Sequence, residues 1–159
     1  MTEKHLSIDY KEYASASEMS PKDQELVNAA LEARAGSYSP YSHFQVGAAL
    51  RLSSGRIIKG ANQENAAYPA GLCAERTAMF AAGANYPGQV FETLAIVASD
   101  HGHLLDEPAT PCGNCRQVMA EYQSKCGKPM EVILIGARRI WKFSKVDDLL
   151  PFIFDSLKA

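Results

Sequence analysis

The sequence predicts an α/β domain with three layers, in which helices cover both faces of a mixed five-stranded sheet. Residues 44–52 alternate between apolar and other side chains and precede a short turn, as in a β-hairpin. Two later runs, residues 93–98 and 131–136, are continuously apolar, which is typical of strands buried on both faces. Helical patterns alternate with these buried strands, and that alternation is typical of a layered α/β fold.

The chain is expected to hold one domain, residues 20–159, preceded by an extension, residues 1–19. The extension shows weak periodicity, and its structure is left open. Ser20 is a favourable N-cap residue and Pro21 suits the first turn of a helix. An amphipathic helix is therefore predicted from Ser20 until Gly36 ends it.

The remaining elements follow from turn residues and from the spacing of apolar residues. Residues 53–55 form the turn that joins the strand at 44–52 to a returning strand at 56–60. The later predicted elements are a helix at 72–82, a strand at 93–98, a helix at 112–125, a strand at 131–136, an edge strand at 140–143 and a last helix from about Val146.

Composition excludes several classes of partner. The 159 residues carry a net charge of −2, and the tightest basic pair is Arg138–Arg139, so we expect no polynucleotide partner. No apolar run reaches the length of a membrane span, so no membrane partner is expected. The first residues lack the apolar core of a signal peptide, and we therefore expect a cytoplasmic protein whose cysteines are reduced.

Three of the four cysteines form a pattern that indicates a metal site. Cys112 and Cys115 make a C-x2-C pair, which alone fits half of a zinc site or a redox dithiol. Cys73 also precedes a predicted helix, and the three thiols would converge if both helices begin at the same edge of the sheet. Three protein ligands and an open position are typical of catalytic zinc. Cys126 lies at the far end of its helix, about 15 Å from Cys115 at 1.5 Å per residue, and is interpreted as an ordinary thiol.

Glu75 and Arg76 lie two and three residues after Cys73, in the first turn of the predicted helix, and both side chains can face the end of the helix. A carboxylate beside a zinc site can act as a proton shuttle. An arginine can offset the negative charge of three thiolates. The alternative interpretation is that both residues decorate an exposed helix start.

The combination of motifs resembles the zinc-dependent cytidine deaminases, a family whose zinc chemistry acts on cytosine. The stretches that carry the resemblance are "CAER" from Cys73, "PCGNCRQ" from Pro111, "SPYSHFQVGAAL" from Ser39 and "NQENAAYP" from Asn62. The last two are similar to the small, three-cysteine, homotetrameric branch that acts on free nucleosides. Within the matched region, Ala67 stands where some relatives carry cysteine, and the loop at 99–110 is slightly longer.

The resemblance implies a role for each matching position. One Zn²⁺ per chain would be bound, and Phe154 would reach a neighbouring subunit's site, so that subunits complete one another's sites. The implied roles are zinc ligands Cys73, Cys112 and Cys115; proton shuttle Glu75; charge compensation by Arg76; sugar binding by Asn62 and Glu64; base binding by Phe44 and the backbone at Ala74; and pocket lining by Tyr68 and Phe154.

The implied reaction is hydrolytic deamination of cytidine and deoxycytidine to uridine and deoxyuridine. Zinc-bound hydroxide would attack C4, Glu75 would shuttle protons, and ammonia would leave. The residues alone leave other interpretations open: a structural zinc module that binds a partner, a polynucleotide-editing deaminase, or a deaminase of antibiotic nucleosides or nucleotides. Phe44 and Phe154 could equally be packing residues. His43, His101 and His103 are not expected to bind metal, because three thiolates leave no position beyond that of water.

Overall fold

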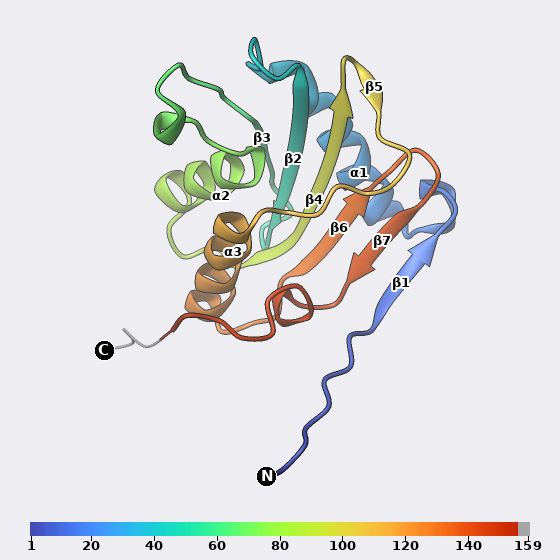
Figure 1. Ribbon diagram of the computed structural model, residues 1–159, viewed down its shortest axis with the longest axis vertical. Coiled ribbons are helices and arrows are strands. Elements are labelled where there is room, and N and C mark those ends of the chain that lie inside the picture. Colours follow the sequence, from blue (N-terminus) through green and yellow to red (C-terminus); the bar gives the residue numbers. More distant parts are fainter. Residues whose placement is uncertain (156–159) are drawn as a thin grey trace.

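A mixed β-sheet with helices on both faces forms the body of the protein (Figure 1). The computed structural model describes residues 1–155. The sheet has the order β1-β7-β6-β4-β2-β3, with β5 paired to β4. Its strands are β1 (Tyr10–Tyr13), β2 (Phe44–Leu52), β3 (Ile57–Ala61), β4 (Phe91–Asp100), β5 (His103–Leu104), β6 (Glu131–Ile135) and β7 (Ile140–Phe143).

Within residues 1–155, three α-helices cover the sheet. In Figure 1, α1 (Pro21–Ala33) lies behind the sheet, whereas α2 (Ala74–Asn85) and α3 (Gly113–Cys126) lie in front. Each face of the sheet has its own buried apolar cluster, one against α1 and the other against α2 and α3. The predicted three-layer architecture is therefore confirmed. None of the helices within residues 1–155 has the length and hydrophobicity needed to cross a lipid bilayer.

The predicted number of strands was wrong, because the sheet has seven strands over the described residues rather than five. All five expected strands are present, but β7 is not the edge strand that was expected, because β1 pairs with it on the side opposite β6. The additional strands are β1, which pairs with β7 at the edge of the sheet, and β5, a two-residue strand beside the end of β4. Both are short and lack a clear alternation of apolar residues, so periodicity could not reveal them.

The last predicted helix is also absent from the described residues. Val146–Asp148 form a single 3₁₀ turn, after which the chain is irregular. Pro151 explains this outcome, because proline cannot donate a helical hydrogen bond and disfavours helical geometry at the residue before it. The other helix predictions are confirmed within a few residues, including the Ser20 cap, whose hydroxyl accepts a bond from the Asp23 amide at 3.2 Å. Gly36 ends the 3₁₀ turn Arg34–Gly36 that directly follows α1.

Close backbone contact sets α2 directly on the sheet. A Cβ added to Gly60 of β3 would lie 2.5 Å from the Ala74 carbonyl oxygen and 2.5 Å from the Ala78 amide nitrogen. Only glycine leaves room for this approach, because both neighbouring atoms belong to the helix backbone. The first turn of α2, which begins after Cys73, is therefore held at a fixed height above β3.

Candidate metal and catalytic site

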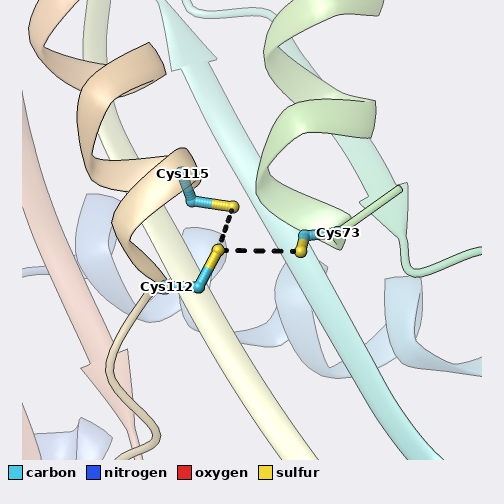
Figure 2. Close-up of side chains that lie close together, drawn as sticks. All are labelled: Cys73, Cys112 and Cys115. Atoms are coloured by element: carbon cyan, nitrogen blue, oxygen red, sulfur yellow. Dashed lines mark hydrogen bonds between the residues drawn. The ribbon is translucent and has the colours of Figure 1, made fainter. Parts of the chain in front are cut away.

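The three predicted cysteine ligands converge at the starts of two helices. Cys73 is the N-cap of α2, Cys112 is the N-cap of α3, and Cys115 lies in the first turn of α3. Figure 2 shows their sulfurs turned toward one another from the two helices. The sulfur of Cys112 lies 3.9 Å from that of Cys73 and 3.5 Å from that of Cys115. The sequence expectation that both helices begin at one edge of the sheet is thus met.

The spacing of the sulfurs fits a tetrahedral metal ion. Zinc–sulfur bonds of about 2.3 Å in tetrahedral geometry place two sulfurs about 3.8 Å apart. The three ligand atoms all lie within 4.8 Å of one another. A disulfide needs about 2.05 Å, so the three thiols are unpaired neighbours rather than a bridged pair. Cys126 is not part of this group: it lies at the end of α3, with its thiol 3.9 Å from the Gln89 carbonyl oxygen.

The charges at the site favour a divalent cation among the thiols. A hydrogen bond from Cys115 and the neighbouring Arg76 guanidinium lower the pKa of Cys73 to about 5. That same hydrogen bond and burial raise the pKa of Cys115 far above its ordinary value. One thiol thus ionises readily while its neighbour resists, because two adjacent thiolates repel each other. A dication between them would offset that repulsion and allow all three to bind as thiolates.

Backbone anchoring holds the second helix start in place. The Arg116 guanidinium donates through Nε to the Pro111 carbonyl at 2.8 Å and through Nη1 to the Leu149 carbonyl at 2.8 Å. These bonds tie the residue before Cys112 to the C-terminal segment.

The predicted charge compensator Arg76 lies on the other helix, with its Nη2 3.6 Å from the Cys73 sulfur.

Glu75 is a buried carboxyl group beside the thiols. It is the second residue of α2, and only 4% of its surface is exposed. Burial is the main cause that raises its pKa, and the negative charge of Cys73 acts in the same direction. A carboxyl group with a raised pKa holds a proton more readily than an ordinary carboxyl group, which suits a residue that must accept a proton and return it.

A cleft of about 430 Å³ opens beside the thiols and Glu75. Most of the side chains that the sequence assigned to substrate binding line this cleft, although they come from two separate stretches of the chain. Its lining includes Phe44, Asn62, Glu64, Tyr68, Cys73, Glu75, Arg76 and Cys112. Two of the residues assigned to substrate binding do not line the cleft: Ala74 is fully buried, and Phe154 lies elsewhere on the surface.

Phe154 is attached to α3 through its backbone. Its amide nitrogen lies 3.4 Å from Gln117 Oε1, and its carbonyl accepts from Gln117 Nε2 at 2.8 Å. Its side chain is 63% exposed, and that of Phe152 is 84% exposed. Within one chain, therefore, Phe154 is neither a cleft residue nor a packed core residue.

The amide of Asn62 is already engaged by the protein on three sides. Its Oδ1 accepts from the Val46 amide at 2.8 Å and from the Ser37 hydroxyl at 2.6 Å. Its Nδ2 donates to the Phe44 carbonyl at 2.8 Å. A side-chain amide has two donor hydrogens and two acceptor lone pairs, so one N–H is left to face the cleft.

The carboxylate of Glu64 is held by the turn that precedes β2. Its Oε2 accepts from the Tyr41 amide at 3.0 Å and from the Ser42 amide at 3.3 Å. Its Oε1 accepts from the Ser42 hydroxyl. That hydroxyl bond is the main cause that lowers the pKa of Glu64, which keeps the carboxylate ionised. Oε1 retains a free lone pair for a further donor.

Sequence reasoning missed the partners of these two residues. Ser37 and Ser42 orient Asn62 and Glu64, but they lie 25 and 22 residues away from them in the chain. The sequence shows that the side chains of Asn62 and Glu64, which lie close together, need hydrogen-bond partners. It does not show which residues supply them. The ring centroids of His43 and His101 lie 5.2 Å apart with the ring planes tilted by 47°, and His101 pairs with Asp100; neither histidine lines the cleft.

Comparisons with known proteins agree with this geometry. The family described as "Cytidine and deoxycytidylate deaminase zinc-binding region" matches residues 20–127, more than half of the chain. A cytidine deaminase of Halalkalibacterium halodurans is 44% identical over 131 residues, which cover 82% of this chain and 92% of the relative. A blasticidin-S deaminase of Bacillus cereus is 33% identical over 137 residues, covering 84% of this chain and 92% of that protein.

Solved structures give the same result for the fold. The crystal structure of a cytidine deaminase from Burkholderia pseudomallei has a TM-score of 0.70 and 44% sequence identity. The match covers 86% of this chain and all of that one. Residues outside the match therefore make up a small share of the protein.

Proposed function

The chain belongs to the cytidine and deoxycytidylate deaminase family of zinc-dependent hydrolases, and we propose that it converts cytidine and deoxycytidine to uridine and deoxyuridine with release of ammonia. One observation carries the proposal: Cys73, Cys112 and the buried carboxyl group of Glu75 line a single cleft, and the buried Cys115 sulfur lies within 4.8 Å of the other two sulfurs. We assign Cys73, Cys112 and Cys115 as the ligands of one zinc ion per chain.

Glu75 is the residue we propose to move protons in this reaction. Bound zinc supplies a Lewis acid that lowers the pKa of a coordinated water to about 7. Glu75 accepts the proton of the attacking water and delivers it to ring N3, which makes C4 more electrophilic. It then transfers the second water proton to the amino group on C4, so that the C–N bond breaks and ammonia leaves. Its buried position keeps bulk water away from both transfers.

The base is proposed to lie between Phe44 and the start of α2. The Phe44 amide donates a hydrogen bond to the Ser42 hydroxyl, and the Phe44 carbonyl accepts one from Asn62. These bonds fix the backbone position from which the aromatic ring extends. The ring would pack against the pyrimidine face. The backbone at Ala74, which Gly60 holds in place, and the Glu75 carboxyl would bind the polar edge of the base.

Asn62 and Glu64 are proposed to recognise one sugar hydroxyl. Their remaining capacity is one donor, on Asn62 Nδ2, and one acceptor, on Glu64 Oε1. A single hydroxyl accepts one hydrogen bond and donates one, so it satisfies both groups at once. Because deoxycytidine is a proposed substrate, the hydroxyl that is recognised must be the 3′ and not the 2′.

This assignment predicts the order of substrates. We expect kcat/KM to be similar for cytidine and 2′-deoxycytidine, and to fall about 10- to 100-fold for 3′-deoxycytidine, which leaves a charged acceptor unpaired. Free cytosine should react more slowly still. Ultraviolet absorbance follows all four reactions. A larger loss with 2′-deoxycytidine than with 3′-deoxycytidine would contradict the assignment.

Phe154 and the neighbouring Phe152 are proposed to act between subunits. Both rings are exposed, and the backbone of Phe154 is fixed to α3 by Gln117, so the segment presents aromatic side chains outward from a defined position. We propose a homotetramer in which Phe154 completes a neighbouring subunit's cleft. Tyr68, which is 79% exposed at the rim of the cleft, would lie beside that contact.

The proposed domain is residues 20–159, with residues 1–19 as an extension whose strand β1 is added to the sheet edge. We propose that the protein works in the cytoplasm, because the site requires three reduced thiols. The net charge of −2 supports a small nucleoside rather than a polynucleotide as substrate.

A further inference from the structure

The turn that precedes β2 contacts both halves of the cleft through one residue, Ser42. Its hydroxyl donates its single proton to Glu64 Oε1 and accepts from the Phe44 amide at 3.0 Å. Glu64 lies on the sugar side of the cleft in the proposed function, and Phe44 lies on the base side. No other described side chain is hydrogen-bonded to both of these residues through one atom.

The hydroxyl also determines which part of Glu64 remains available. The backbone amides of Tyr41 and Ser42 hold Oε2, so that oxygen faces the turn. The Ser42 hydroxyl holds Oε1 from one side and leaves one lone pair of that oxygen free. Without it, the carboxylate would keep its bonds at Oε2 but could rotate about them, and Oε1 would lose its fixed direction.

From this geometry we infer that Ser42 is a positioning residue for sugar recognition, which aims Glu64 Oε1 at the substrate hydroxyl. The inference rests on the proposed function, because the proposed function assigns the substrate hydroxyl that Asn62 and Glu64 bind. Ser42 itself makes no substrate contact in this assignment. It acts by keeping an acceptor in place before the substrate arrives, which is pre-organisation of the site.

The test compares variants and substrates together. Ser42→Ala should lower kcat/KM for cytidine and for 2′-deoxycytidine about tenfold, the scale of one hydrogen bond to a charged group, mainly through a higher KM. With 3′-deoxycytidine, which lacks the hydroxyl, the same substitution should have almost no effect, because Asn62 and the pairing of β2 with β4 still hold Phe44 in place. This dependence on the substrate separates a positioning role from general damage, as in a double-mutant cycle.

Two further variants complete the design. Ser42→Thr keeps the hydroxyl and should restore most of the activity on cytidine. Ser54→Ala removes a serine hydroxyl from the exposed turn between β2 and β3, outside the cleft, and should leave all three substrates unchanged. Because Ser42 is exposed, its loss is not expected to prevent folding, and circular dichroism of each variant checks this.

The outcomes distinguish the inference from the function on which it rests. An equal loss on all three substrates, or no loss on any, would overturn the positioning role while leaving the deaminase proposal intact. Failure of the unsubstituted protein to release ammonia from cytidine would overturn the proposed function and the inference with it. A loss confined to the two substrates that carry the 3′-hydroxyl, with rescue by threonine, supports both.

Discussion

Replacing Glu75 by glutamine is expected to abolish turnover while the fold and the metal site remain. Glutamine has nearly the same size, so the space that the buried side chain fills beside the cysteines is kept. It cannot accept a proton from water or return one to the ring. Loss of a single general base costs about 10²- to 10⁴-fold, and Glu75 serves at two steps, so kcat should fall by more than about 10⁴-fold.

The measurement is ammonia release from cytidine by purified protein, with zinc determined in the same samples. Glu121→Gln offers a matched control, because it makes the same chemical change on the exposed side of α3. Its activity should equal that of the unsubstituted protein. Turnover near the normal rate in Glu75→Gln, with zinc retained, would show that another group moves the protons.

Removing one sulfur from the cysteine cluster is expected to have the second large effect. Cys112 is exposed, so its replacement by serine leaves the apolar core untouched. Its sulfur lies between the other two, at 3.9 Å and 3.5 Å, and two cysteines cannot close the same metal shell. We expect zinc content to fall well below one ion per chain and activity to fall to background, because zinc affinity depends on the number of thiolates.

Cys126→Ser is the control for this change. It alters a thiol near the end of α3 that is not part of the cluster, so zinc content and rate should stay normal. Arg76→Ala should give an intermediate result, since it removes the donor to the Cys73 sulfur but no ligand. Full zinc occupancy and full activity in Cys112→Ser would rule out the proposed ligand set.

The order of elements could be predicted from the sequence because the apolar patterns of the main strands are long. The runs at 93–98 and 131–136 lie at the centre of the sheet, where β4 and β6 pair in parallel. Strand β1 could not be found this way. Its side chains are mostly exposed, and it is held by pairing with β7 and by stacking of Tyr10 on Phe143 at 5.3 Å, contacts that a local pattern does not contain.

Within the site, helix starts were easier to predict than loop contacts. Cys73 and Cys112 come together because α2 and α3 begin at the same edge of the sheet, which the alternation of elements already indicates. The hydrogen bonds that Ser37 and Ser42 make to Asn62 and Glu64 depend on the path of two loops, and no periodicity describes such a path. Those bonds decide which atoms remain for a substrate.

X-ray absorption at the zinc edge of the purified protein tests the central claim most directly. We expect one zinc per chain, with three sulfur neighbours at about 2.3 Å and one nitrogen or oxygen neighbour at about 2.0 Å. The nitrogen or oxygen neighbour marks the position from which Glu75 would take its proton. A shell of four sulfurs, or zinc absent from active protein, would contradict the catalytic assignment.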